Sequence, residues 1–312
     1  MTMTAGLHSG CATDQGLQRA HNEDRVWADD TTGVYLVIDG LGGHAAGELA
    51  AQTALQVIVN ELAGSAVLDP EAAVRSAITE ANNQIYSLAR SSPENEGMAC
   101  VLTLAVVRGE VVTVGHVGDS RLYLIWNGTL RKLTSDHSPV GEQEDQGELT
   151  ESEAMEHPRR NEVFRDVGSC ERTAGDHEFI EVRWFPFHSS AALLLCTDGL
   201  SDLLSSSEIG AIVETYEGDP AAIATSLIEA ANDHGGLDNI SVVFVPGPEF
   251  IGVHSVAMAD ARTRHAITRI RPARPRWKRG LLRVVWLLIG ILLGMAMLAA
   301  LQRIWSTGGW LR

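Results

Sequence analysis

The sequence has few cysteines, few aromatic residues and no visible secretory signal. Its 312 residues include four cysteines, none in C-x-x-C spacing, which disfavours a structural zinc site and fits a reducing compartment. Aromatic residues make up 5 %, hydrophobic residues 45 % and charged residues 21 %. This globular composition disfavours collagen, a coiled coil or a mostly disordered chain. Residues 1–10 contain neither a basic stretch nor an apolar run, so we expect no secretory signal.

Basic residues are also scarce over most of the chain. The 24 lysines and arginines face 40 aspartates and glutamates, which gives a formal net charge of −16 and disfavours nucleic acid as the main partner. Residues 1–250 carry 13 basic and 39 acidic side chains, a net charge of −26. Residues 251–312 carry 11 basic side chains and a single acid, a net charge of +10. The two segments are therefore physically different.

Long uncharged runs are missing except near the C-terminus, at Val284–Leu301. A helix of this length spans about 27 Å, close to the ~30 Å hydrocarbon core of a membrane. With its flanking leucines the run predicts a transmembrane helix over residues 281–302, against the alternative of a buried helix in a globular core. Gly290 and Gly294 form a G-x-x-x-G motif, a weak indication of self-association.

Basic side chains set the expected orientation of this span. Eight of them lie in residues 262–279, before the span, and only Arg303 and Arg312 come after the span, so the positive-inside rule places the N-terminal part in the cytoplasm. The sequence thus predicts a single-pass protein of the cell membrane. Its expected parts are a folded domain (1–248), a basic juxtamembrane linker (249–280), the membrane helix (281–302) and a short tail (303–312).

Apolar periodicity in the acidic part predicts both helices and strands. Asp69 followed by Pro70 is typical of a helix start. Helices are expected at residues 48–62, 70–89, 151–156, 206–215 and 220–232. Strands are expected at residues 33–40, 100–107, 111–117, 121–126, 129–133, 191–196 and 240–245. Tight turns at Arg108-Gly109 and Asn127-Gly128 imply antiparallel pairing, so the expected fold class is α+β.

Single aspartates recur at the ends of the expected strands. Asp39, Asp119, Asp198 and Asp238 each lie beside glycine or a polar turn next to an apolar strand. One such residue is often only a cap or turn residue. A carboxylate there is costly unless it is paired or binds metal, and four in the same context favour one shared site. Oxygen ligands without His or Cys partners indicate Mg²⁺ or Mn²⁺ rather than zinc.

Six short strings carry a family resemblance. In chain order they are RAHNED (19–24), DGLGGHAAGE (39–48), GHVGDSRLY (115–123), LTSDHS (133–138), LLLCTDGLSD (193–202) and GGLDNISV (235–242). With them the sequence resembles the metal-dependent protein phosphatases of the protein phosphatase 2C type, specifically their bacterial branch, over about residues 8–246. The resemblance implies a four-layer αββα sandwich, in which two antiparallel sheets lie between helix pairs and a metal cleft opens at one end.

The resemblance also implies that the domain hydrolyses phosphoserine and phosphothreonine in proteins by a metal-activated water, without a phosphoenzyme. The implied cofactors are two Mn²⁺ or Mg²⁺ ions, with a third, weaker ion in bacterial members. The expected partners are phosphorylated proteins, a cognate bacterial Ser/Thr kinase and the membrane, through the C-terminal helix.

Family roles transfer to the matching positions. The resemblance implies that Asp39 bridges the two ions, that the carbonyl of Gly40 binds one of them, and that Asp198 and Asp238 complete the other shell. Arg19 resembles the family's phosphate-binding arginine, and a guanidinium fork suits a phosphate dianion.

Further roles are less specific. Glu23 and Asp24 resemble metal ligands or acceptors for metal-bound water, and Asp119 matches a carboxylate that binds the third ion together with Asp198. Leu41 stands where some eukaryotic members place a histidine proposed as general acid, so the proton donor is unassigned. His44 is a candidate acid, and equally a helix-start residue bonded to backbone.

An acidic stretch at residues 142–172 occupies the place of a mobile flap in bacterial members. It is either a solvated loop or an element that selects basic phosphopeptides. Two alternative hypotheses for the function remain. The chain could be an inactive family member that serves as a metal-binding scaffold or signalling partner, or residues 39–48 could form a nucleotide-binding glycine loop. The loop lacks the GK[ST] ending of a P-loop and the Rossmann spacing.

Overall fold

The computed structural model describes residues 6–42, 45–63 and 69–252, all within the unit Met1–Val256. The elements, in chain order, are β1 (Gly10–Asp14), β2 (Arg25–Asp29), β3 (Val34–Leu41), α1 (Ala45–Ala63), α2 (Pro70–Ser91), η1 (Pro93–Asn95), β4 (Ala99–Arg108), β5 (Val111–Val117), β6 (Arg121–Trp126), β7 (Thr129–Lys132), α3 (Pro139–Gln146), α4 (Glu151–Met155), β8 (Glu181–Pro186), β9 (Ala192–Cys196), α5 (Asp198–Ser201), α6 (Ser206–Val213), α7 (Pro220–Asp233) and β10 (Ile240–Pro246).

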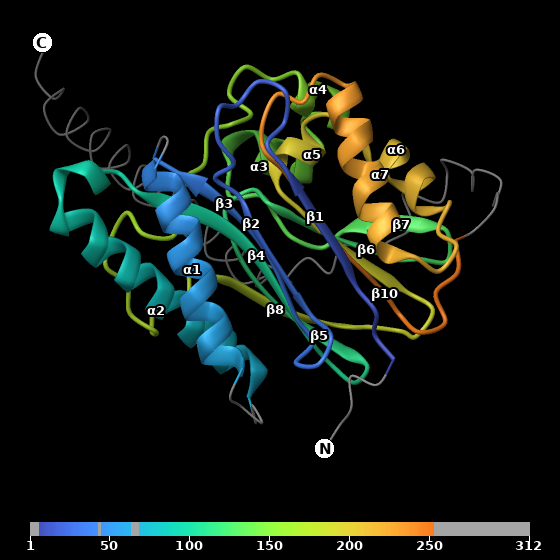
Figure 1. The fold of residues 1–312 in the computed structure, drawn as a ribbon, viewed down its shortest axis with the longest axis horizontal. Coiled ribbons are helices and arrows are strands. Elements are labelled where there is room, and N and C mark those ends of the chain that lie inside the picture. Colours follow the sequence, from blue (N-terminus) through green and yellow to red (C-terminus); the bar gives the residue numbers. More distant parts are fainter. Residues whose placement is uncertain (1–5, 43–44, 64–68, 253–312) are drawn as a thin grey trace, which may run out of the picture. The chain divides into compact units, whose positions relative to one another are not determined.

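The strands of the described residues form two five-stranded sheets, which Figure 1 shows between two groups of helices. One sheet has the order β1-β10-β9-β6-β7 and the other β2-β3-β4-β5-β8, and all pairings are antiparallel. Within these residues the chain passes from one sheet to the other between β1 and β2, between β5 and β6, between β7 and β8, and between β8 and β9.

Alternating side chains let one strand serve two cores. On β3, Leu36 and Ile38 pack with the side chains of α1 and α2, whereas Tyr35 and Val37 pack in the layer between the sheets. In the other sheet, Phe244 of β10 joins the core beneath α6 and α7. These three cores produce the expected four-layer arrangement of helices, two antiparallel sheets and helices.

Local sequence signals are confirmed where they are strongest. Helix α2 begins at Pro70, and the side chain of Asp69 accepts a hydrogen bond from the backbone N–H of Ala72. Asn127 and Gly128, which join β6 to β7, both have positive φ (52° and 69°), as a tight hairpin turn requires. By contrast, β1, β2, β8 and α3 were not expected from the periodicity.

The sequence predicted a single-pass protein of the cell membrane with its folded domain in the cytoplasm. The structure contradicts this predicted location. Across residues 6–42, 45–63 and 69–252 no helix is long and apolar enough to cross a membrane. The longest, α2, has 22 residues, but it carries charged side chains on one face and packs the other into the core. The predicted span at 281–302 lies outside the described residues.

Close packing of α2 on β5 gives a test of the fold. A Cβ atom on Gly115 would lie 2.4 Å from Cγ1 of Val74 and 2.7 Å from Cδ1 of Ile78. We predict that Gly115→Ala lowers the free energy of unfolding by about 1–3 kcal/mol through overpacking. The matched control is Gly210→Ala in α6, where a Cβ atom meets nothing within 4 Å. It should raise stability by about 0.5–1 kcal/mol, and urea unfolding that gave the two variants the same sign would contradict this packing.

Candidate metal centre

Strand register brings the predicted carboxylates to one end of the sandwich. In one sheet, Asp39 lies near the end of β3, opposite the start of β4 and so beside the end of β5, which Asp119 follows. In the other sheet, Asp198 follows β9, whose end pairs with the start of β10, and Asp238 precedes that start. The four aspartates therefore converge from strand ends and adjoining turns that are far apart in sequence.

The two central aspartates, Asp39 and Asp198, lie close enough for each to change the pKa of the other. Burial, followed by the carboxylates of Asp24, Asp119 and Asp238, raises the pKa of Asp39 well above its ordinary value. Burial, followed by repulsion from neighbouring carboxylates, of which Asp39 is the first, raises the pKa of Asp198 well above its ordinary value. These groups cannot all be ionised at neutral pH unless cations lie among them.

Two oxygens of the cluster are buried and lack a hydrogen-bond partner: Oδ1 of Asp198 and Oδ1 of Asp24. The other oxygen of Asp24 accepts a hydrogen bond from the hydroxyl of Thr197 at 2.9 Å, and burial raises the pKa of Asp24 to about 7. A buried oxygen without a hydrogen-bond partner destabilises the fold unless an ion or a water molecule binds to it. The donors are hard oxygens, so the residues present fit Mg²⁺ or Mn²⁺.

Backbone and side-chain oxygens also meet beside α1. A Cβ atom on Gly47 would lie 2.1 Å from Oε2 of Glu23 and 2.8 Å from the carbonyl oxygen of Gly40, so glycine lets both oxygens approach the helix. His44, the candidate acid, lies outside the described residues. Within the residues that are described, no three His, Cys, Asp or Glu side chains are arranged to hold a metal ion as they stand.

Arg19 lies at the exposed rim of the cluster. One of its terminal nitrogens is 2.6 Å from Oδ2 of Asp238, and the two side chains are 51 % and 23 % exposed. Partial burial lowers the pKa of Arg19, but the carboxylates of Asp238, Asp39 and Asp198 outweigh it and raise that pKa. The guanidinium therefore stays charged beside the carboxylates and open to solvent.

Asn239 ties the loops around the cluster together. Its Oδ1 accepts a hydrogen bond from the backbone N–H of Glu23 (2.8 Å), and its Nδ2 donates to the carbonyls of Gln15 (2.8 Å) and His21 (2.9 Å). Sequence reasoning assigned Asn239 only to the turn at Asp238. Its wider role was not visible because the bonded residues are more than 200 positions away in the chain.

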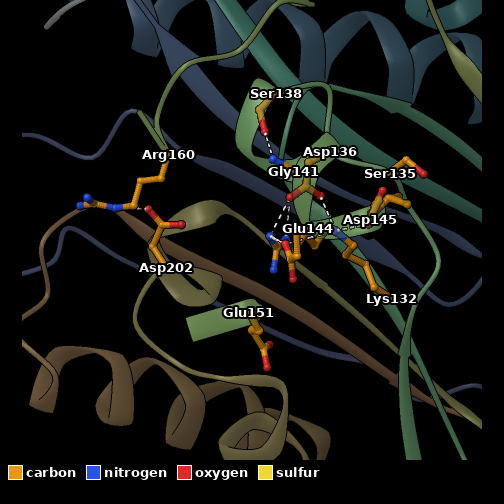
Figure 2. Close-up of polar contacts among 12 residues, drawn as sticks. Lys132, Ser135, Asp136, Ser138, Gly141, Glu144, Asp145, Glu151, Arg160 and Asp202 are labelled. Atoms are coloured by element: carbon orange, nitrogen blue, oxygen red, sulfur yellow. Dashed lines mark hydrogen bonds and ion pairs between the residues drawn. The ribbon is translucent and has the colours of Figure 1, made fainter. Parts of the chain in front are cut away.

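A buried ion network that sequence reasoning missed lies beside Asp119. Figure 2 shows Asp136, Glu144 and Asp145 gathered near Lys132. The guanidinium of Arg121 pairs with two of these acids, Asp136 and Glu144. A terminal nitrogen of Arg121 is 2.7 Å from Oδ2 of Asp136 and 2.9 Å from Oε2 of Glu144. Lys132 Nζ is 2.9 Å from Oδ1 of Asp145. The signal available in the sequence was the string LTSDHS, which contains Asp136.

Asp119 faces this network across a small cavity. Burial and the carboxylates of Asp136 and Asp202 raise the pKa of Asp119 to about 7. Asp119, Asp198 and Asp202 line a cavity of about 20 Å³, room for one water or ion. Asp202 is held by Arg160, with Nε to Oδ2 at 2.9 Å (Figure 2).

Several acids of the stretch 142–172 have structural partners. Glu144 and Asp145 belong to the ion network, and Glu151 accepts hydrogen bonds from the backbone N–H and hydroxyl of Ser206 at 2.7 and 2.6 Å. Glu153 caps α4. The stretch is thus not simply a solvated loop, and only part of its negative charge is available to a substrate.

The architecture and the convergent carboxylates define a class, the metal-dependent hydrolases with an oxygen-only site. The family model described as protein phosphatase 2C matches residues 17–227. The chain belongs to the protein phosphatase 2C family, and it is a metal-dependent serine/threonine phosphatase. This confirms the resemblance, and the alternatives of an inactive scaffold and a nucleotide-binding loop are set aside.

Curated relatives and solved structures agree with this assignment. The serine/threonine phosphatase Stp of Listeria welshimeri is 35% identical over 246 residues, which cover 77% of this chain and 95% of the relative. The phosphatase PstP of Mycobacterium tuberculosis is 34% identical over 77% of this chain and 45% of its own length. A crystal structure of the tuberculosis PstP has a TM-score of 0.70 at 32% identity, covering 77% and 98% of the two chains. The catalytic domain of PstP in complex with two manganese ions has a TM-score of 0.68 at 32% identity, covering 77% and 97%.

The buried pair of Arg121 and Asp136 should dominate acid stability. We predict that Asp136→Asn lowers the free energy of unfolding by about 3 kcal/mol at pH 7, because it leaves Arg121 partly unpaired. Burial opposes ionisation of Asp136, but Arg121 and Lys132 lower its pKa. A depressed carboxyl pKa stabilises the fold above the unfolded value of about 3.9 and ceases to do so as the pH falls through the folded value. In urea unfolding, the difference in free energy of unfolding between wild type and Asp136→Asn should therefore become smaller below about pH 4. Equal free energies of unfolding for wild type and Asp136→Asn at pH 7 would contradict the pairing of Arg121 with Asp136.

Repulsion among the aspartates predicts opposite effects with and without metal. In metal-free buffer, Asp39→Asn should raise the free energy of unfolding by about 1–2 kcal/mol, since one buried like charge is removed. Mn²⁺ at about 100 times its Kd should stabilise the wild type by about 2.7 kcal/mol and the variant much less. The control is Asp233→Asn on the exposed end of α7. Thermal unfolding in which Mn²⁺ stabilised wild type and Asp39→Asn equally would refute the site.

Proposed function

We propose that this chain removes phosphate from phosphoserine and phosphothreonine in proteins, with Asp39, the carbonyl of Gly40, Asp198 and Asp238 as ligands of two divalent ions. The observation that carries the proposal is the convergence of buried, mutually repelling carboxylates at one end of the sandwich, with an unpartnered oxygen on Asp198. The PstP catalytic domain described with two manganese ions supports Mn²⁺ as one of the ions used, and Mg²⁺ has the same ligand preference.

Two divalent ions, when bound, supply Lewis-acid activation of water for attack on phosphorus. The chain's own contribution is to hold acidic oxygens in place for them. Thr197 fixes one oxygen of Asp24 and leaves the other free, and Asn239 fixes the backbone of Glu23. Glu23 and Asp24 are thereby positioned to accept hydrogen bonds from water in the site or to serve as ligands.

Arg19 binds the phosphate in this proposal. Its guanidinium is exposed, charged and held at the rim by one contact with Asp238, so its remaining N–H groups can donate to phosphate oxygens. A bidentate arginine also opposes the charge that develops on the equatorial oxygens during phosphoryl transfer.

Asp119 and Asp198 are assigned to a third, weaker ion. Both line the small cavity beside Asp202, and burial together with neighbouring carboxylates raises the pKa of each. The kinase that supplies the phosphorylated substrates is expected to be a serine/threonine kinase of the same cell, because a phosphatase of this class requires one.

The test is hydrolysis of a phosphothreonine peptide in the presence of Mn²⁺. Asp39→Asn should lower kcat/KM by about 10³-fold, the size typical for loss of an electrostatic element of the transition state, and a chelator should abolish wild-type activity. The control Asp233→Asn should retain full activity. Wild-type hydrolysis that survives both the chelator and Asp39→Asn would overturn the assigned site.

A further inference from the structure

Two exposed leucines lie on the loops that carry Arg19 and Asp238. Leu17 is 67 % exposed and precedes Arg19 by two residues. Leu237 is 42 % exposed and directly precedes Asp238. Both therefore lie beside the group assigned to the phosphate, at a rim that is otherwise polar.

The two loops are locked to each other by their backbones. The N–H of Leu17 donates to the carbonyl of Gly236 at 2.8 Å. A Cβ atom on Gly16 would lie 2.1 Å from the carbonyl oxygen of Asp238, so the chains are in direct contact there. The bond from Asn239 to the carbonyl of Gln15 holds the same pair of loops. The leucines are thus fixed relative to Arg19, and a ligand that contacts them need not order a mobile loop.

Neighbouring residues leave the leucines uncovered. Next to them stand Gly235 and Gly236, both with positive φ and neither with a side chain. A Cβ atom on Gly236 would lie 2.8 Å from Cγ of Leu17, and one on Gly235 would lie 3.7 Å from Cδ2 of Leu237. Gly236 therefore lies against Leu17 and Gly235 against Leu237, and neither glycine has a side chain that would cover its leucine.

We propose that Leu17 and Leu237 bind an apolar side chain that flanks the phosphorylated residue of the substrate protein. The inference rests on the proposed function, in which Arg19 holds the phosphate. Arg19 contacts Asp238, which directly follows Leu237, and the backbone of Leu17 is bonded to Gly236. Two residues of extended chain span at most about 7 Å, so these leucines are the apolar side chains that the structure offers to a residue next to the phosphorylated one. An apolar side chain gains by leaving water there, whereas a charged one loses hydration without a partner.

The experiment compares two phosphothreonine peptides of equal length and charge, with leucine or asparagine on both sides of the phosphothreonine. The full chain with Mn²⁺ should prefer the leucine peptide in kcat/KM. Leu17→Asn and Leu237→Asn should each reduce this preference about five-fold, as expected when roughly half a leucine is no longer buried. The loss should fall on KM for the leucine peptide rather than on kcat. The control is Val111→Thr, an exposed apolar residue at the opposite end of the sheet, which should keep the preference.

The two levels of failure are distinct. If wild type hydrolyses both peptides with equal kcat/KM, or if both asparagine variants keep the preference, the leucine surface is refuted and the phosphatase assignment stands. If wild type hydrolyses neither peptide, the proposed function fails and the inference falls with it.

Discussion

Electrostatic repulsion among buried carboxylates is the constraint on which this structure turns. Asp24, Asp39, Asp119, Asp198 and Asp238 approach one another where burial weakens solvent screening, and each neighbour makes ionisation of the next more costly. A domain that only had to fold would not collect them. Their convergence is intelligible if cations supply the missing positive charge, and the stability of the domain then depends on metal as much as on packing.

The rest of the fold holds these acids in place. Two sheets with three apolar cores form a rigid support, and the crossings from β1 to β2 and from β5 to β6 occur at the end where the aspartates lie. Asn239 joins the loops of that end through three hydrogen bonds. Near Asp119, Arg121 pairs with Asp136 and Lys132 pairs with Asp145. The protein's own cations thus neutralise part of the negative charge in this region.

Sequence reasoning succeeded where a signal was local. Asp69 followed by Pro70 marks a helix start by its own chemistry, and Asn127-Gly128 marks a turn by its backbone preference. It failed for β2 and β8, whose side chains are mostly half exposed and mix charged with apolar residues, so no clean alternation exists to be read. The pairing of Arg121 with Asp136 depends on how β6, β7 and α3 pack. The apolar run near the C-terminus was assigned from its length, its hydropathy and its basic flanks, and it lies outside the described residues.

The site shows the same division between local and tertiary signals. A strand-end aspartate beside glycine can be recognised one residue at a time, and that is why Asp39, Asp119, Asp198 and Asp238 were found. Residues that restrain these aspartates, such as Thr197 and Asn239, carry neutral side chains whose value comes only from the partners that the fold supplies. The chemistry we propose is thus assigned to a few residues with a sequence signature, while the restraint that holds them is distributed among residues without one.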